Sequence, residues 1–146
     1  MSVSYWMIEG IGIDVDKIRP YLNKRKVLNL VLKHYPDDEL ALEWKSRRDL
    51  SGLDIDEFIH GNPFDTLGDL LTHCDDTDCL TFGNYGDGGV YIYYPPSMPW
   101  HRTENEPDSQ EEVHRRLIDA VLKVADMDAA AINKLIDDDI YEVGWG

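Results

Sequence analysis

Runs of β-forming residues predict strands at both ends of the chain and a hairpin near its middle. The first run extends from Val3 to Ile8, and a shorter run extends from Ile140 to Val143. Residues 80–94 contain two more runs, separated by the turn sequence Gly-Asp-Gly-Gly at 86–89. Glycines at 10 and 12 should end or bend the first strand. Two consecutive prolines after residue 94 should end the hairpin, because proline cannot donate to a strand ladder.

The loop length decides which hairpin side chains share a face. A two-residue loop at Asp87-Gly88 would pair Phe82 with Tyr93 and divide the apolar side chains between both faces. A three-residue loop at 87–89 gives one apolar face (Leu80, Phe82, Val90 and Ile92) and one tyrosine face (Tyr85, Tyr91 and Tyr93). We favour the three-residue loop because it makes the better core, and because three-residue loops ending in a left-handed glycine are common.

Apolar residues at helical spacing predict that residues 14–73 form helices joined by short turns. The expected helices cover about 21–35, 37–49 and 53–59, and a fourth is expected to open at Asn62-Pro63. Ser109 and Glu112 have the spacing of a capping box. The apolar stripe of the helix that follows them consists of Val113, Leu117, Ala120, Val121 and Val124. Asp128 should cap one more helix, through about Ile136.

This order of elements predicts one α+β domain over residues 1–146. We expect both terminal strands to pair with the hairpin, which would make a small, mainly antiparallel sheet of about four strands. The helices should pack on one face of that sheet.

Charge is the most unusual feature of the composition. The 146 residues carry a formal charge of −15, with 29 Asp and Glu against 14 Lys and Arg. Residues 1–48 have a net charge of +2, so the acidic excess lies entirely in residues 49–146. Such a density of carboxylates repels phosphate, and we therefore expect no direct binding of nucleic acid. The basic clusters at 24–26 and at 45, 47 and 48 are interpreted as solvated helix faces.

The sequence also indicates a compartment. No apolar run approaches the roughly 20 residues needed to cross a bilayer. Glu9 and Asp14 lie where a secretory signal would have its apolar core, so export and membrane attachment are not expected. Two cysteines do not make a disulfide framework, which favours the reducing cytoplasm.

The densest group of metal-ligating residue types is the segment from His73 to Cys79. Cys74 and Cys79 could reach one zinc ion with His73, and His60, His101 or an aspartate would complete the site. A metal-binding domain or small enzyme centred on His73, Cys74 and Cys79 is therefore one hypothesis. We favour an acidic turn after a helix, because zinc sites usually show paired spacings. No calcium loop, phosphate loop or nucleophile motif is present, so no cofactor and no catalytic residue are predicted.

Tyrosines and carboxylates near the hairpin suggest a binding surface. Tyrosine and tryptophan supply rigid contact area, and carboxylates attract basic proteins. The predicted interaction residues are Tyr85, Tyr91, Tyr93, Trp100, Asp75, Asp76 and Asp78. We therefore favour a non-enzymatic interaction domain for a basic partner. It would act as an inhibitor that mimics nucleic acid, as anti-restriction and anti-CRISPR proteins do, or as an immunity protein against a toxin. A regulatory homodimer that buries the tyrosine face is the other alternative.

Overall fold

The computed structural model describes residues 5–64, 66–75, 79–84, 90–94 and 109–145. The strands are β1 (Tyr5–Asp14), β2 (Thr81–Asn84), β3 (Val90–Tyr94) and β4 (Ile136–Trp145). The helices are α1 (Val15–Ile18), the 3₁₀ helix η1 (Arg19–Tyr21), α2 (Lys24–His34), α3 (Glu39–Lys45), α4 (Ile55–His60), α5 (Leu67–Thr72), α6 (Gln110–Leu122) and α7 (Ala129–Leu135). This arrangement confirms the predicted α+β class.

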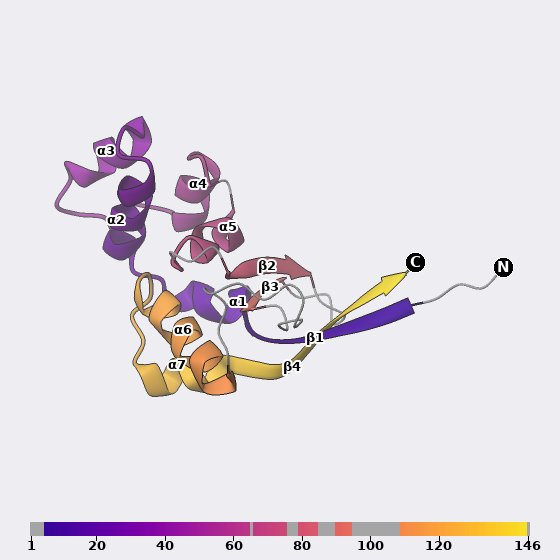
Figure 1. Ribbon diagram of the computed structural model, residues 1–146. Coiled ribbons are helices and arrows are strands. Elements are labelled where there is room, and N and C mark those ends of the chain that lie inside the picture. Colours follow the sequence, from indigo (N-terminus) through magenta and orange to yellow (C-terminus); the bar gives the residue numbers. More distant parts are fainter. Residues whose placement is uncertain (1–4, 65, 76–78, 85–89, 95–108, 146) are drawn as a thin grey trace.

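The four strands form one antiparallel sheet in the order β2-β3-β1-β4. The expectation that both terminal strands pair with the hairpin was wrong, because only β1 pairs with β3. β4 pairs with β1 instead, and these two ten-residue strands lie side by side along most of their length (Figure 1). β3 has five residues and could not offer β4 so long a ladder. The length of the terminal strands therefore explains their pairing.

The glycines of the first strand bend it without ending it. The pairing of β1 with β4 shifts register between Gly10 and Gly12, which marks a β-bulge. Beyond the bulge, Ile13 still pairs with Ile136 on one side and with Ile92 on the other. The strand therefore continues to Asp14, six residues past the predicted end at Ile8.

The hairpin register separates the apolar and tyrosine faces as predicted. Phe82 pairs with Ile92 and Asn84 pairs with Val90, so the two-residue loop with its Phe82–Tyr93 pair is excluded. A three-residue loop at 87–89 would pair position 86 with Val90, whereas Val90 pairs with Asn84, so that loop prediction was also wrong. The register differs from the predicted one by two residues, which leaves the same side chains on each face. Ile92 is fully buried on the face that also carries Ile13, whereas Tyr91 and Tyr93 form a separate small cluster on the other face.

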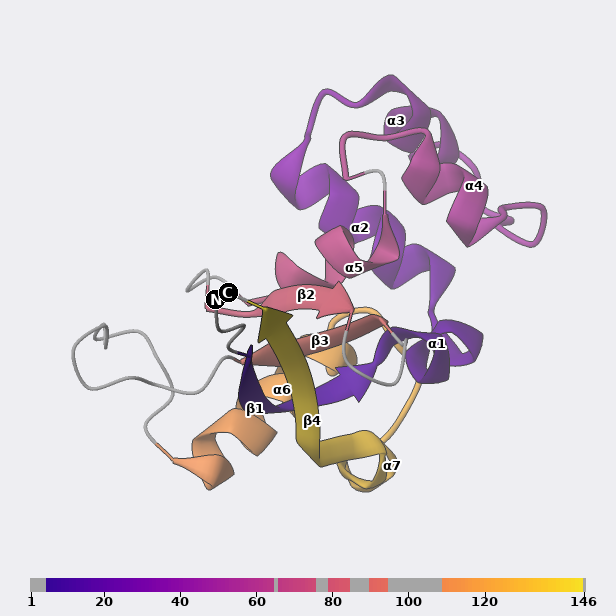
Figure 2. The ribbon, with the colours of Figure 1, turned by 90° about the vertical axis from the view of Figure 1, so that its right-hand side faces the viewer.

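The main core lies between the Ile13–Ile92 face and the helices. α5 and α6 contact the sheet and each other, and α2 lies beside α5 (Figure 2). The buried residues of α2 belong to the same core. The apolar stripe predicted for α6 is confirmed, since four of its five members are buried and Val113 is partly buried. The largest fully buried side chains are Phe64, Ile13, Ile18, Leu28, Ile59, Leu70, Leu71, Ile92, Leu117 and Ile132.

Short polar side chains begin nearly every helix. Ser109 Oγ accepts from the Glu112 amide at 3.1 Å, and Asp128 accepts from the Ala131 amide at 2.7 Å, as predicted. Asp14, Asn23, Asp38 and Asp54 cap α1 to α4 in the same way. Several of the many aspartates therefore stabilise helix ends.

The start of α5 differs from the prediction. Thr66 caps this helix, which begins at Leu67 rather than at Pro63. Asn62 is buried and forms a turn: its Oδ1 accepts from the Phe64 amide, and its Nδ2 donates to the Phe58 carbonyl. The Asn-Pro pair therefore shapes the connection between α4 and α5.

The basic cluster at the start of α2 contacts carbonyl groups. Lys26 Nζ donates to the carbonyls of Leu122 and Ala125 at the end of α6, at 3.2 and 3.1 Å. Arg25 donates to the carbonyl of Arg47 just after α3. Cations are favourable at the carboxyl ends of helices, so these side chains join α2 to its neighbours. The Lys26 side chain is still 42% exposed, so these contacts add to the predicted solvated character of the cluster.

Candidate functional site

The predicted tyrosine surface is only partly exposed. Tyr91 is 4% exposed and packs against the half-buried Tyr93. Tyr85 and Trp100 lie outside the described residues. The role of these four side chains in binding stays a prediction, and Tyr91 offers almost no area to a partner in this conformation.

Asp75 lies inside the protein rather than on an acidic surface. Its side chain is 8% exposed, accepts a hydrogen bond from the Tyr94 hydroxyl, and lies 3.9 Å from Nη1 of Arg116. Burial, together with the hydrogen bond and the charge of Asp75, raises the pKa of Tyr94 far above its usual value. Asp75 therefore joins β3 to α6, while the other two predicted carboxylates, Asp76 and Asp78, lie outside the described residues.

The hypothetical metal site receives no support from the described part of the chain. Cys74 is 1% exposed and its Sγ lies 3.8 Å from the Leu70 carbonyl. His73 Nδ1 contacts the Asp69 carbonyl at 2.8 Å, and the ring packs against His34 and Phe64. Nowhere among the described residues do three potential ligands come together around one point. These side chains belong to the packing between α2 and α5.

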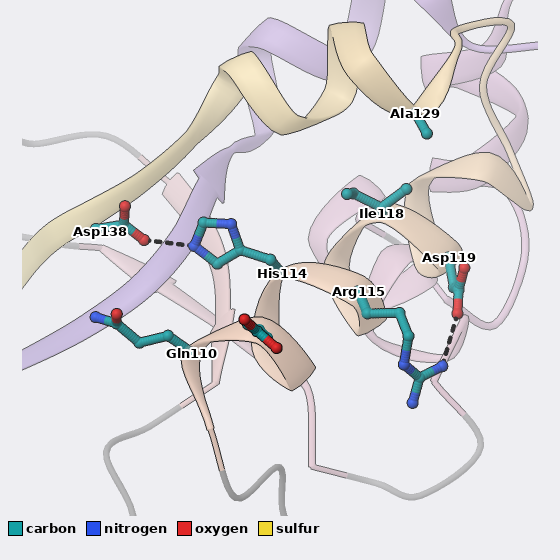
Figure 3. A pocket seen from close by; sticks show the side chains of 8 residues that line it. Gln110, His114, Arg115, Ile118, Asp119, Ala129 and Asp138 are labelled. Atoms are coloured by element: carbon teal, nitrogen blue, oxygen red, sulfur yellow. Dashed lines mark hydrogen bonds and ion pairs between the residues drawn. The ribbon is translucent and has the colours of Figure 1, made fainter.

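An open groove of about 570 Å³ lies where α6, α7 and the start of β4 meet (Figure 3). Ile118 of α6 and Ala129 of α7 give it an apolar floor, and most of its lining is apolar. The described residues that line it are Gln110, Glu111, His114, Arg115, Ile118, Asp119, Ala129 and Asp138. None of the predicted site residues that the structure describes lines this groove.

Carboxylates outnumber cations around this floor. The described lining includes three carboxylates, Glu111, Asp119 and Asp138, and one arginine, Arg115. Nη1 of Arg115 lies 3.2 Å from Asp119 Oδ2, and its Nε donates to Glu112 at 3.1 Å. The hydrogen bond and the charge of Glu112 raise the pKa of Arg115, so the guanidinium group stays protonated. Its positive charge is balanced by the carboxylate of Glu112.

Each groove carboxylate keeps an oxygen for another cation. The Glu111 side chain makes no hydrogen bond or ion pair with any described residue. Asp119 and Asp138 each use one oxygen, toward Arg115 and His114, and the second oxygen of each contacts no polar side chain within the described ranges. The groove can therefore accept hydrogen bonds from a positively charged group.

His114 connects three elements at the wall of the groove. Its Nε2 lies 2.6 Å from Oδ1 of Asp138 on β4 (Figure 3). Its Nδ1 lies 3.2 Å from Oδ1 of Asn133 on α7. A carboxylate only accepts, so Nε2–H donates to Asp138. Both ring nitrogens thus contact polar side chains, and the described residues that line the groove include no serine, threonine or cysteine.

The sequence gives little indication of this groove. Residues 111, 114, 115 and 118 share one face of α6, but their composition is that of an ordinary solvated helix face. Residues 137–139 read as one acidic run among several. The one local signal is Ile118, which is apolar on an otherwise polar face.

The fold and the groove define a small acidic α+β protein with an open, carboxylate-rimmed surface groove. The chain matches no protein-family model, and comparison with curated proteins and with solved structures finds no significant match. Within the described segments, no helix combines the length and the apolar character needed to cross a membrane.

Proposed function

We propose that this protein is a non-enzymatic interaction domain whose groove between α6, α7 and β4 binds a cationic segment of a partner protein. One observation carries the proposal: three carboxylates with open oxygens surround an apolar floor, and the nearby arginine is already paired.

Lysine and arginine match both properties of this groove. Their aliphatic stems can lie on Ile118 and Ala129 while their charged ends donate to the open oxygens of Glu111 and Asp138. Charge-assisted hydrogen bonds of this kind are stronger than neutral ones. The charge of −15 supports the same partner class, since it attracts basic proteins over a distance and speeds their association.

The biological form of the interaction is also a proposal. A basic protein such as a nucleic-acid-binding enzyme or a toxin has the complementary charge, which agrees with an inhibitor of the anti-restriction, anti-CRISPR or immunity type. Charge and size are the support for this part. The engagement of both nitrogens of His114 makes an enzyme the less favoured interpretation.

Binding of a short lysine- and alanine-containing peptide, acetylated and amidated at its ends, tests the groove directly. Glu111→Gln removes an open carboxylate that has no partner among the described side chains, so the fold should be unaffected. Loss of one charge-assisted contact should weaken binding about five- to tenfold, which corresponds to about 1 kcal/mol. Calorimetry at low and high salt should also show that binding weakens as salt screens the charges.

Asp37→Asn is the matched control. Asp37 is exposed and lies in the chain between α2 and α3. In both ribbon views α3 lies at the opposite end of the molecule from α7 (Figures 1 and 2). The Asp37→Asn substitution removes the same charge far from the groove, so it should change the dissociation constant of the peptide less than twofold. Equal weakening by both variants would show that net charge alone attracts the peptide. Absence of binding by the unmodified protein would reject the proposed function.

A further inference from the structure

We infer that His114 makes cation binding in the groove pH-sensitive, so that protonation of its ring releases the bound segment. This inference rests on the proposed function of the same groove. It is drawn from the contacts that His114 makes with Asp138 and Asn133.

The neutral ring leaves the groove ready for a cation. Nε2–H donates to Oδ1 of Asp138, and the carboxylate keeps its full negative charge and its open Oδ2. The three groove carboxylates and Arg115 then give a local charge of −2. The amide of Asn133 can present its nitrogen to the bare Nδ1, because an asparagine amide can turn over.

The geometry also accommodates the charged ring. Oδ1 of Asn133 lies 3.2 Å from Nδ1 of His114. It can therefore accept a hydrogen bond from Nδ1 when a second proton binds there. The imidazolium is then held between Asn133 and Asp138, and its contact with Asp138 becomes an ion pair. The local charge falls from −2 to −1, and the carboxylate nearest the ring is neutralised by the protein's own side chain. A bound lysine or arginine would have to compete with that internal cation.

Histidine is the residue type that controls this groove near neutral pH. Among the described side chains, the other charged groups that line the groove are Glu111, Arg115 and Asp119 on α6 and Asp138 on β4, while α7 contributes the uncharged Asn133 and Ala129. Carboxyl and guanidinium groups generally keep their charge between about pH 5.5 and 7.5, whereas imidazole changes its charge in that range. The His114 side chain is 28% exposed, so protons have access to it.

The peptide used above allows a test by calorimetry at about pH 7.5 and 5.5, because lysine does not titrate in that range. The dissociation constant of the unmodified protein should rise about tenfold at the lower pH, within the usual span of coupling between two sites. His114→Gln keeps a donor for Asp138 but cannot become charged, so its dissociation constant should change less than twofold. His60→Gln, an exposed histidine of α4 outside the groove, should retain the full pH dependence.

The outcomes separate the two proposals. Binding at pH 7.5 that is equally strong at pH 5.5 overturns the role of His114 and leaves the proposed function standing. A pH dependence that persists in His114→Gln overturns it as well. If the unmodified protein binds the peptide at neither pH, the proposed function fails and the inference fails with it.

Discussion

The hydroxyl of Tyr94 on β3 donates a hydrogen bond to the carboxylate of Asp75, 19 residues earlier in the chain. Arg116 of α6 lies on the same carboxylate, with 3.9 Å between Nη1 and Oδ2. Tyr94 is 3% exposed and the Asp75 side chain 8%, so water cannot easily replace either partner. This contact joins the hairpin, the end of α5 and α6.

Tyr94→Phe should destabilise the fold. The substitution keeps the ring in the core and removes the donor, which leaves a nearly buried carboxylate with fewer partners. Such losses cost about 1–3 kcal/mol, so the midpoint of urea denaturation should fall. Tyr21→Phe, at a side chain that is 50% exposed, is the control and should change little. A Tyr94→Phe variant as stable as the unmodified protein would contradict this account of the contact.

Tyr94 should also make the free energy of unfolding depend on pH in alkaline solution. Burial and Asp75 raise the pKa of Tyr94 above its ordinary value near 10, so the folded state retains a proton that the unfolded state loses. That contribution is fully present below about pH 10 and is lost as the pH rises further. The stability difference between the unmodified protein and Tyr94→Phe should therefore shrink above pH 10. Denaturation curves between about pH 8 and 11 measure this difference, and a constant gap would count against it.

Glu112 should contribute to the loss of stability in acid. Hydrogen bonds from Arg115 and Arg116 lower the pKa of this carboxyl below its ordinary value near 4.5. A lowered pKa stabilises the fold above that value, and the contribution disappears as the pH falls through the folded-state pKa. Glu112→Gln should flatten the acid limb of the stability curve below about pH 4.5. Glu111→Gln, which removes the same charge at the neighbouring position, is the matched control.

Lys26→Met tests the contact between α2 and the end of α6. Methionine keeps an apolar stem but cannot donate to the carbonyls of Leu122 and Ala125. The loss should cost about 1 kcal/mol, the usual size of a cation at a helix carboxyl end together with its hydrogen bonds. Lys45→Met is the matched control, because Lys45 is exposed and makes no contact of this kind within the described ranges. Equal effects in thermal denaturation would show that the carbonyl contacts add nothing.

Gly68→Ala should disturb the contact between α5 and β2. A Cβ at this position would lie 2.7 Å from Cδ2 of Phe82, whereas a Cβ at Gly52 would meet nothing within 4 Å. The strain should outweigh the gain of alanine in a helix, for a net cost of about 1 kcal/mol. Gly52→Ala should be nearly neutral. The cost at Gly68 should vanish in a Phe82→Ala background, and a double-mutant cycle with no coupling would disprove the contact.

Helices and caps were predictable because their signals are local. Asp54, Ser109 and Asp128 each accept a hydrogen bond from an amide three residues later, so a few neighbouring residues are enough to place a helix start. The two faces of the hairpin followed from side-chain alternation. Asn62 shows where local signals are not sufficient, because the pair Asn-Pro is compatible with both a helix cap and a turn. In the structure the buried Asn62 side chain hydrogen-bonds to the backbone of Phe58 and Phe64, which stabilises the turn.

Sequence by itself determined the class of fold, most of the helices, the apolar face of the hairpin and the acidic character of the protein. Tertiary structure alone decided the order of the strands and the groove. His114 and Asp138 are 24 residues apart, and they meet because α7 leads directly into β4, which pairs with β1 across the sheet. Such a contact depends on how distant segments pack, which no local pattern of residues encodes.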